Sequence, residues 1–397
     1  MTTPPAPPVV VGIVGAGTMG AGIAQTCLAA GHEVVLYDVD EEAIERGQAR
    51  IADGLARLVA RGRLAEEDSE RMIGALRHAL TLEAVATDAE LVIEAALEDI
   101  DLKRTIIRAL GAAGGPGAIL ATNTSALSVT DIAYASGVPQ RVLGLHFFNP
   151  APVLPLVEVV ATDQTGHDTL AGAVRFVEGL GKTPIVCRDA PGFIVNRVNR
   201  PFTLEALRML EAGEASVEEI DQAVAGAGYP MGPLALMDLV GVDVNYAVAT
   251  ALWEAFEGAV RFAPSPIQHR LVELGRLGRK TGEGFYRYEA GRQVGLSERL
   301  SEVGVGPARG DPLASEEIVG RIELAIINEA YHAAGEGVAE ASDIDRALKL
   351  GANYRHGPFE RAGILGLRQV IDGLSRLEAL YGERFRVAPV LWQVASI

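Results

Sequence analysis

The sequence predicts an α/β domain built on a parallel sheet, followed by two tandem all-α domains. Over residues 9–189, short valine-rich apolar runs alternate with helical stretches, which is typical of strands that are covered on both faces by helices. From residue 190 onward the pattern is helical, and residues 197–241 resemble 321–366 at an offset of 124 or 125. A chain of 397 residues is also long enough for two or three separate cores.

The first expected strand and helix enclose a glycine-rich turn. Residues 9–14 form an apolar run of strand length, the sequence GAGTMG follows at 15–20, and residues 21–30 are expected to be helical. In a dinucleotide-binding (Rossmann-type) unit, the first glycine permits the turn, the second lets the backbone approach the pyrophosphate, and the third lets helix and strand pack closely. A tight turn without a ligand is the alternative. The residues predicted to bind a dinucleotide here are Gly15, Gly17, Thr18, Met19 and Gly20.

The second apolar run, residues 34–37, is closed by Asp38, which lies 18 residues beyond Gly20. A carboxylate near this spacing accepts hydrogen bonds from a ribose 2′-hydroxyl and repels a 2′-phosphate. The predicted cofactor is therefore NAD, with NADP disfavoured.

A helical arm is expected at about residues 41–79, as one helix over 41–63 and a second over 66–79. The arm carries a run of arginines, which is either a solvated face or a docking surface for a polyphosphate. These arginines are Arg46, Arg50, Arg57, Arg61 and Arg63.

Two further buried strands are expected at residues 91–96 and 119–123, and polar residues follow both of them. Glu98 and Lys103 come after the first, and Ser125 comes after the second. Ligands of open α/β sheets bind beyond the carboxyl ends of the strands. Each of these residues alone could be a helix cap or a surface pair, but their recurrence at one edge favours a ligand site.

His146 and Glu158 are the strongest candidates for chemistry. Each interrupts an apolar strand, at 142–148 and at 156–160. A glutamate flanked by leucine and valine is costly to bury without a partner, and the loop between these strands can bring them side by side. A carboxylate that accepts the Nδ1 proton fixes the imidazole tautomer and leaves the other nitrogen free to exchange a proton with an alcohol. A satisfied core histidine with an unrelated glutamate is the alternative.

Six separated motifs resemble the L-3-hydroxyacyl-CoA dehydrogenase family, which includes the 3-hydroxybutyryl-CoA dehydrogenases. The resemblance covers about residues 9–288, and the motifs occur in family order. They are GAGTMG at 15–20, NTS at 123–125, HFFNP at 146–150, VEV at 157–159, PGFIVNR at 191–197 and GRKTGEGFY at 278–286.

The resemblance implies roles for individual residues. It makes His146 the acid/base and Glu158 its orienting partner, and it implies that Ser125 and Asn196 position the reacting oxygen. The substrate it implies is a coenzyme A thioester, which the arm contacts in this family. Gly54 stands here in place of a family serine and Arg61 in place of the usual lysine, so both are candidate substrate contacts. The positions that match NAD contacts are Asp38, Glu98, Lys103, Ser125, Asn149 and Lys280.

The repeat in the second half predicts a helical domain at 190–289, a linker at 290–315 and a second, degenerate copy at 316–397. The copy lacks the chemistry, because Asn196 becomes Gly320 and no second nucleotide fold precedes it. Family members with one helical domain commonly dimerise through it. We therefore expect the second copy to pack on the first as an internal pseudo-dimer within a monomer. An ordinary homodimer interface is the alternative.

Composition narrows the partners and the compartment. The formal net charge of −17 argues against nucleic acid and against an anionic membrane, and no apolar stretch approaches the ~20 residues that span a bilayer. Residues 1–8 are expected to be a disordered tail. Cys27 and Cys187 lie in apolar stretches far apart in the sequence, so we expect no disulfide and a reducing compartment, the cytoplasm. No metal site is predicted.

The function predicted from these observations is NAD-dependent, reversible oxidation of a 3-hydroxyacyl-CoA to a 3-oxoacyl-CoA, in fatty-acid or related acyl-CoA metabolism. Two other functions compete with it. One is a dehydrogenase of a free hydroxy or sugar acid, which needs no coenzyme A arm. The other is a nucleotide-binding protein without catalysis.

Overall fold

The computed structural model describes residues 9–87, 89–306 and 313–395. It divides into two compact units, Met1–Phe193 (unit 1) and Ile194–Ile397 (unit 2), and each is described by itself. The expected tail at 1–8 lies outside the described residues.

Unit 1 is built on one sheet of eight strands among the described residues, in the order β3-β2-β1-β4-β5-β6-β7-β8. Strands β1 to β6 pair in parallel, β7 runs antiparallel to β6, and β8 is parallel to β7. The expected α/β architecture is thus confirmed. The strands are β1 (Val10–Val14), β2 (Glu33–Tyr37), β3 (Leu76–His78), β4 (Leu91–Glu94), β5 (Ile119–Thr122), β6 (Val142–Phe147), β7 (Leu156–Ala161) and β8 (Thr183–Arg188).

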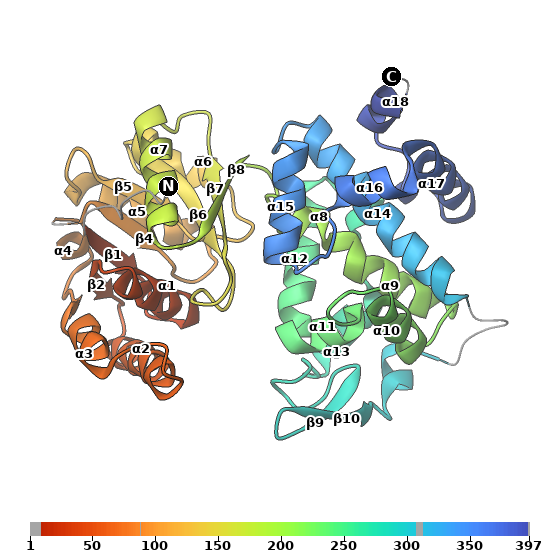
Figure 1. Cartoon of the computed structure of the whole chain (residues 1–397), viewed down its shortest axis with the longest axis horizontal. Coiled ribbons are helices and arrows are strands. Elements are labelled where there is room, and N and C mark those ends of the chain that lie inside the picture. The colour runs from red at the N-terminus through yellow and green to blue at the C-terminus, as the bar shows by residue number, and fades with distance from the viewer. Residues whose placement is uncertain (1–8, 88, 307–312, 396–397) are drawn as a thin grey trace. The chain divides into compact units, whose positions relative to one another are not determined.

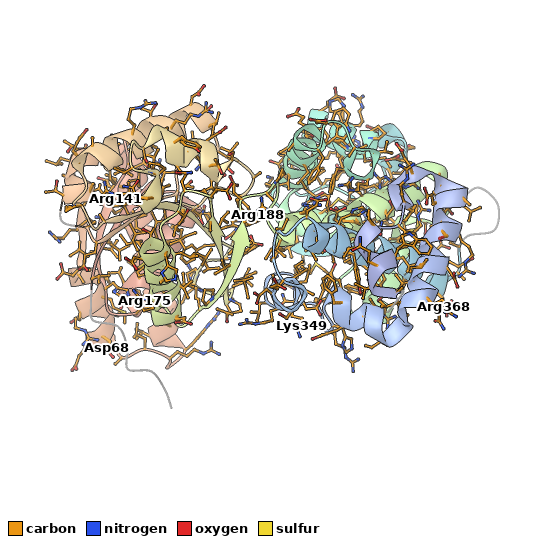
Figure 2. All side chains as sticks on the ribbon, turned by 90° about the horizontal axis from the view of Figure 1, so that it is seen from above. Asp68, Arg141, Arg175, Arg188, Lys349 and Arg368 are labelled. Carbon is orange, nitrogen blue, oxygen red and sulfur yellow. The ribbon has the colours of Figure 1, made fainter. Side chains whose placement is uncertain are left out.

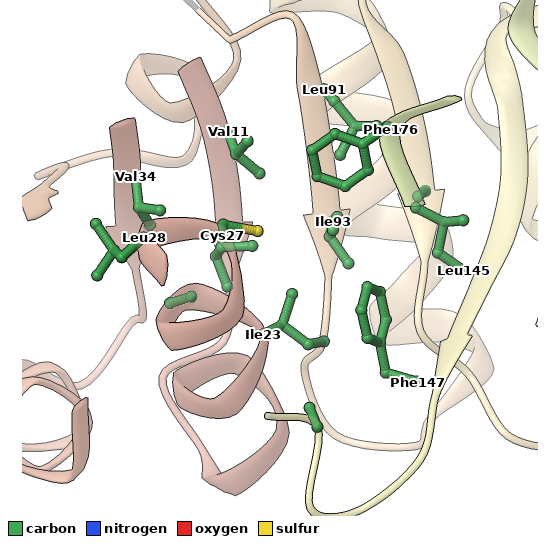
Figure 3. Close-up of a cluster of buried hydrophobic side chains, with 14 of the residues drawn as sticks. Val11, Ile23, Cys27, Leu28, Val34, Leu91, Ile93, Leu145, Phe147 and Phe176 are labelled. Carbon is green, nitrogen blue, oxygen red and sulfur yellow. The ribbon is translucent and has the colours of Figure 1, made fainter. Parts of the chain in front are cut away.

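Helices cover both faces of this sheet (Figure 1). Side chains alternate along each strand, so that Ile13 enters one core and Val14 enters the other. The first core, with α1, α2 and α7, is shown in Figure 3, where Phe147 and Phe176 pack near Ile93. The helices are α1 (Thr18–Ala29), α2 (Glu41–Ala60), α3 (Glu66–Gly74), α4 (Leu82–Thr87), α5 (Ile100–Ala113), α6 (Val129–Ala135) and α7 (His167–Gly179).

The arm is shorter than the sequence predicted. The helix expected over 66–79 ends at Gly74, and Leu76–His78 instead form the edge strand β3, which pairs in parallel with β2. The helical pattern of the preceding residues hid a strand of three residues, which is too short to show an alternation of its own.

Unit 2 consists of two copies of one helical motif, and the repeat extends further than the sequence comparison indicated. Helices α8 and α9 correspond to α14, and each later helix of the first copy has a counterpart in the second at nearly the same offset. The first copy contains α8 (Val195–Val198), α9 (Arg200–Ala212), α10 (Val217–Gly226), α11 (Pro233–Val240), α12 (Val242–Ala255) and α13 (Pro266–Glu273). The second contains α14 (Ser315–Gly335), α15 (Ala341–Gly351), α16 (Pro358–Leu365), α17 (Leu367–Tyr381) and α18 (Pro389–Ala395).

The same aspartate holds the same turn in both copies. The Asp221 carboxylate accepts the N–H groups that open α11, and the Asp345 carboxylate accepts those that open α16, at 2.8–2.9 Å. A Cβ atom on Gly232 or on Gly357 would lie 2.2–2.3 Å from the carboxylate of its own copy. This contact explains why the glycine recurs with the aspartate.

The two copies pack against each other as a single compact unit, with α14 beside α9 (Figure 1). Arg197 of the first copy pairs with Glu329 of the second at 2.7 Å, and Arg321 of the second pairs with Glu205 of the first at 2.9 Å. All four side chains are buried, whereas Arg368 lies on the outside of the unit (Figure 2). The reciprocal pairs are those of an isologous interface within one chain.

The stretch 290–315, expected to be a linker, contains a strand. Strand β10 (Arg292–Leu296) pairs with β9 (Tyr286–Glu289), and residues 307–312 lie outside the described residues. In the described part of the chain, no single helix is long and apolar enough to cross a bilayer. Helices α11 and α12 would be so only when taken together, and they meet at 102°.

The buried ion pairs between the copies should be essential for stability. Replacing Glu205 by Gln removes the buried carboxylate that Arg208, Arg321 and Arg384 share, so we expect the free energy of unfolding to fall by about 3 kcal/mol or more, measured by denaturant titration. Glu378→Gln is the matched control, because Glu378 pairs with the exposed Arg386, and it should cost about 1 kcal/mol or less. Equal losses for both variants would contradict a structural role for the buried pairs.

Candidate functional site

The glycine turn of unit 1 has one glycine at each place that requires it. Gly15 has φ +103°, which side-chain-bearing residues rarely adopt. A Cβ atom on Gly20 would lie 1.8 Å from the carbonyl oxygen of Gly15, so only glycine lets α1 start this close to β1. A Cβ atom on Gly17 would meet nothing within 4 Å. Contacts within the protein therefore do not require glycine at position 17, whereas a ligand lying on this backbone would require it.

Asp38 is tied directly to this turn. Its Oδ2 accepts the backbone N–H of Ala16 at 2.8 Å, which holds the end of β2 against the turn. A cavity of about 680 Å³ opens beside it, and its lining includes the exposed apolar side chains of Val39 and Leu80 together with the carboxylates of Asp40, Glu41 and Glu45. Apolar side chains beside a carboxylate suit a planar base attached to a ribose. The turn and this cavity together therefore fit the adenosine and pyrophosphate portions of a dinucleotide.

Lys103 lies in a buried network at the carboxyl ends of β4 and β5. It is 1% exposed, and its Nζ lies 2.7 Å from Oε1 of Glu94 and 3.3 Å from Oε2 of Glu98. The Glu94 carboxylate also accepts the Thr122 hydroxyl at 2.6 Å. Lys103 thus supplies the charge that allows Glu94 to be buried.

Glu98 connects this network to the loop that contains Ser125. Its Oε1 accepts the Thr124 hydroxyl at 2.6 Å and the backbone N–H of Ser125 at 2.8 Å. The polar residues that the sequence placed at one sheet edge do come together there, and the loop with Ser125 is fixed by hydrogen bonds.

His146 and Glu158 form a buried pair. They lie directly opposite each other on the antiparallel strands β6 and β7, and Nδ1 of His146 is 2.6 Å from Oε2 of Glu158. Their exposures are 4% and 0%. The aromatic rings of Phe148 and Phe193 lie 4.4 and 5.6 Å from the imidazole, between centroids. The hydrogen bond sets the tautomer, and the aromatic rings restrict the motion of the imidazole.

The strand that carries His146 is held in place by Asn123, whose Oδ1 accepts the backbone N–H of Phe147 at 2.9 Å. Asn149, a predicted cofactor contact, is exposed just beyond this strand and precedes Pro150 across a cis peptide bond. The NTS and HFFNP motifs are therefore joined at neighbouring strand ends.

In unit 2, Asn196 lies on the short helix α8, just before two residues that bind the second copy. Arg197 is fully buried and contacts Glu329 of α14 and Glu336 just after it. Asn199 accepts the hydrogen of the Tyr354 hydroxyl. The helix that presents Asn196 is therefore held by the degenerate copy.

Lys280 lies in a glycine-rich loop of unit 2, and its Nζ is 2.7 Å from Oδ2 of Asp243. The loop is organised by buried Asp238, which accepts the N–H groups of Phe285 and Tyr286 at 2.8–3.0 Å. Burial raises the pKa of Asp238 to about 6. A Cβ atom on Gly284 would lie 2.0 Å from this carboxylate.

The two candidate coenzyme A residues of the arm differ in their surroundings. A Cβ atom on Gly54 would lie 2.2 Å from Oε1 of Gln25 on α1, at the far end of a flexible side chain, so a small side chain here requires only that Gln25 change its conformation. Arg61 is exposed at the end of α2. Of the arginines on the arm, Arg46 is paired with Asp40 and Glu42.

Three site residues escaped sequence reasoning, namely Glu94, Asn123 and Asp238. Glu94 carried the same signal as Glu158, an acid inside an apolar strand. Asn123 and Asp238 bind backbone N–H groups far away in the sequence, and such contacts leave no local pattern.

Comparison with known proteins agrees with this geometry. The family model described as 3-hydroxyacyl-CoA dehydrogenase, NAD binding domain, matches residues 10–190, and that described as 3-hydroxyacyl-CoA dehydrogenase, C-terminal domain, matches residues 192–288 and again 318–397. The second match marks the duplicated copy independently.

Relatives of two lengths are found. A 3-hydroxyadipyl-CoA dehydrogenase of Escherichia coli is 37% identical over 98% of this chain and 97% of its own length. A 3-hydroxybutyryl-CoA dehydrogenase of Mycobacterium tuberculosis is 45% identical over 70% of this chain and 98% of its own. The solved structure of a 3-hydroxybutyryl-CoA dehydrogenase of Escherichia coli superposes with a TM-score of 0.90 at 35% identity, covering 98% of this chain and 99% of that one. The chain belongs to the 3-hydroxyacyl-CoA dehydrogenase family and is an NAD-dependent oxidoreductase.

Proposed function

We propose that His146 is the acid/base of this dehydrogenase and that Glu158 orients it. The observation that carries the proposal is the buried contact of 2.6 Å between Nδ1 and the carboxylate. This contact leaves Nε2 to take the proton of the substrate hydroxyl, and the carboxylate stabilises the imidazolium that results. In the reverse direction, Nε2 returns the proton to the oxygen of the 3-oxo group.

The cofactor contacts in this proposal begin at the glycine turn of unit 1. Gly15, Gly17, Thr18, Met19 and Gly20 bind the pyrophosphate with their backbone, and Asp38 binds the adenosine ribose. When bound, NAD accepts the hydride from the substrate carbon. Further contacts are assigned to Glu98, Ser125, Asn149 and Lys280. The 1% exposure of Lys103 favours a supporting role, in which it holds Glu98 for the cofactor.

The substrate is proposed to be a 3-hydroxyacyl-CoA ester. Ser125 and Asn196 hydrogen-bond its reacting end, and α2 with Arg61 and Gly54 faces coenzyme A. The relatives' names specify acyl chains that end differently, in a carboxylate for 3-hydroxyadipyl-CoA and in a methyl group for 3-hydroxybutyryl-CoA. The far end of the acyl chain is thus the feature by which substrates of this family differ.

A monomer in the cytoplasm is the proposed state of the protein. The reciprocal pairs of Arg197 and Arg321 already occupy the face through which two copies meet, which supports a chain that is complete by itself. Cys27 and Cys187 are free and buried, and burial raises the pKa of Cys27 to about 12. Such inert thiols suit a reducing compartment.

Replacing Gly17 by Ala should weaken cofactor binding without weakening the fold. The added methyl group meets open space in the protein but occupies the place of the pyrophosphate, so we expect the Kd for NADH to rise about tenfold or more, with the thermal midpoint unchanged. NADH fluorescence titration and thermal denaturation measure the two effects. Gly20→Ala is the contrasting variant and should lower the thermal midpoint, because its methyl group collides with Gly15. An unchanged Kd in Gly17→Ala would contradict the assigned site.

Replacing His146 by Gln should lower kcat by about 10²-fold or more in both directions, because the reacting oxygen loses the group that takes its proton in oxidation and returns it in reduction. Steady-state rates with acetoacetyl-CoA and NADH measure this, and NADH titration should show unchanged binding. His32→Gln is the matched control, since His32 is equally buried and, among the described residues, its side chain bonds the backbone N–H of Val9 alone. It should keep kcat within about threefold of wild type. Undiminished turnover in His146→Gln would refute the acid/base assignment.

Sedimentation equilibrium over a hundredfold range of protein concentration should give the mass of one chain throughout. The reason is that the second helical copy covers the face of the first. A mass of two chains at micromolar concentration would show that the internal pseudo-dimer does not replace a partner subunit.

A further inference from the structure

Arg200, at the start of α9, is a buried cation without a charge partner in the described parts of the chain. It is 6% exposed. Its Nη1 lies 3.5 Å from the carbonyl oxygen of Asn245, and its Nε has no hydrogen-bond partner among the described residues. Burial lowers its pKa to about 10. Burying a guanidinium with so few hydrogen bonds costs free energy. The packing of the unit therefore does not account for an arginine at this position.

Arg197 and Arg321, which are also buried in unit 2, are each paired with carboxylates. Arg197 is held by Glu329 and Glu336, and its pKa is raised by these carboxylates against the effect of burial. Arg321 is held in the same way by two carboxylates of the first copy. The carboxylate of Asp243, two residues before Asn245, is bound by Lys280. Arg200 therefore differs in kind from its neighbours.

The duplication provides an internal comparison. At the offset of 124, residues with structural partners recur, as Arg197 does in Arg321 and Glu205 in Glu329. At the same offset, Asn196 becomes Gly320 and Arg200 becomes Leu324. The copy that lost the chemistry thus lost Arg200 together with Asn196. The fold of the motif does not need an arginine here, because the second copy has the same helix with leucine at this position.

Arg200 also lies close to the proposed substrate contact. It follows Asn196 by four residues, and Asn199 between α8 and α9 keeps helical dihedral angles. Residues four apart share a face of a helix and are separated by about 6 Å along its axis. That separation is comparable to the few C–C bonds that join C3 of a short acyl chain to its far end.

We propose that Arg200 belongs to the substrate site and binds a carboxylate at the far end of the acyl chain, so that the preferred substrates are 3-hydroxyacyl-CoA esters of dicarboxylic acids. The inference rests on the proposed function, because it takes Asn196 to contact the reacting end. A guanidinium binds a carboxylate through two parallel hydrogen bonds, and the bound anion supplies the missing charge. The phosphates of coenzyme A are also anionic, but the pantetheine arm separates them from the reacting carbon.

Two esters of equal chain length test the proposal, 3-hydroxyadipyl-CoA, which ends in a carboxylate, and 3-hydroxyhexanoyl-CoA, which ends in a methyl group. The readout is the ratio of their kcat/KM values, followed by NADH formation. In Arg200→Leu, which places the residue of the second copy in the first, this ratio should fall by about 30-fold or more, mainly through KM for the dicarboxylic ester. Arg200→Lys keeps the charge and should restore part of the ratio. The exposed Arg355 serves as the control, and Arg355→Leu should leave the ratio unchanged.

Thermal denaturation separates this role from a structural one. Arg200→Leu should unfold at the same temperature as wild type or higher, because it removes an unpaired buried charge. Arg197→Leu, one turn away and fully paired, should unfold at a lower temperature.

A ratio that stays within threefold of wild type in Arg200→Leu would overturn the inference. So would an equal fall for both esters, which would place Arg200 against a group common to all coenzyme A esters. If wild type oxidised neither ester, the proposed function itself would fail, and the inference would fall with it.

Discussion

A carboxylate buried in an apolar strand must have a partner, and the active architecture of unit 1 depends on this constraint. Glu158 lies on a strand with no exposure to solvent, and the partner it finds is the imidazole directly opposite on β6. Register is therefore critical, because a slip of one residue between β6 and β7 would send every side chain to the other face and leave the charge unmatched. The same electrostatic requirement that positions the histidine also selects the strand pairing.

The sequence was most informative where a rule of chemistry is local. The GAGTMG turn, Asp38 and the His146–Glu158 pair were predicted from spacing and residue type. The structure brings His146 and Glu158 into contact as expected, and it adds a hydrogen bond from Ala16 of the turn to Asp38. It was least informative where a partner comes from far along the chain. Lys103 was predicted to contact the cofactor, but nothing in the sequence indicated that it is buried against Glu94. Strand β3 is too short to show a period, and pairing with β2 decides its conformation.

The same distinction holds in unit 2. The duplication was visible because structural residues recur at a fixed offset, and these turn out to be the residues that cap helices or cross between copies, such as Asp221 and Arg197. The expected linker was inferred from its glycine and proline content, yet β10 pairs there with β9, because strand pairing can accept a flexible composition when a hairpin partner is adjacent. Residues that differ between the copies are as informative as those that recur. They mark the positions at which packing alone does not determine the residue.

The reciprocal pairing of Arg197 with Glu329 and of Arg321 with Glu205 has a consequence for how this protein can change over time. In a symmetric homodimer every mutation in the interface occurs twice, so both symmetry-related contacts change at the same time. Here the two ends are encoded separately. One half can therefore lose or gain a side chain while the other stays as it was, and a change harmful in duplicate can be accepted singly. Joining two equal partners into one polypeptide releases them from the obligation to remain equal.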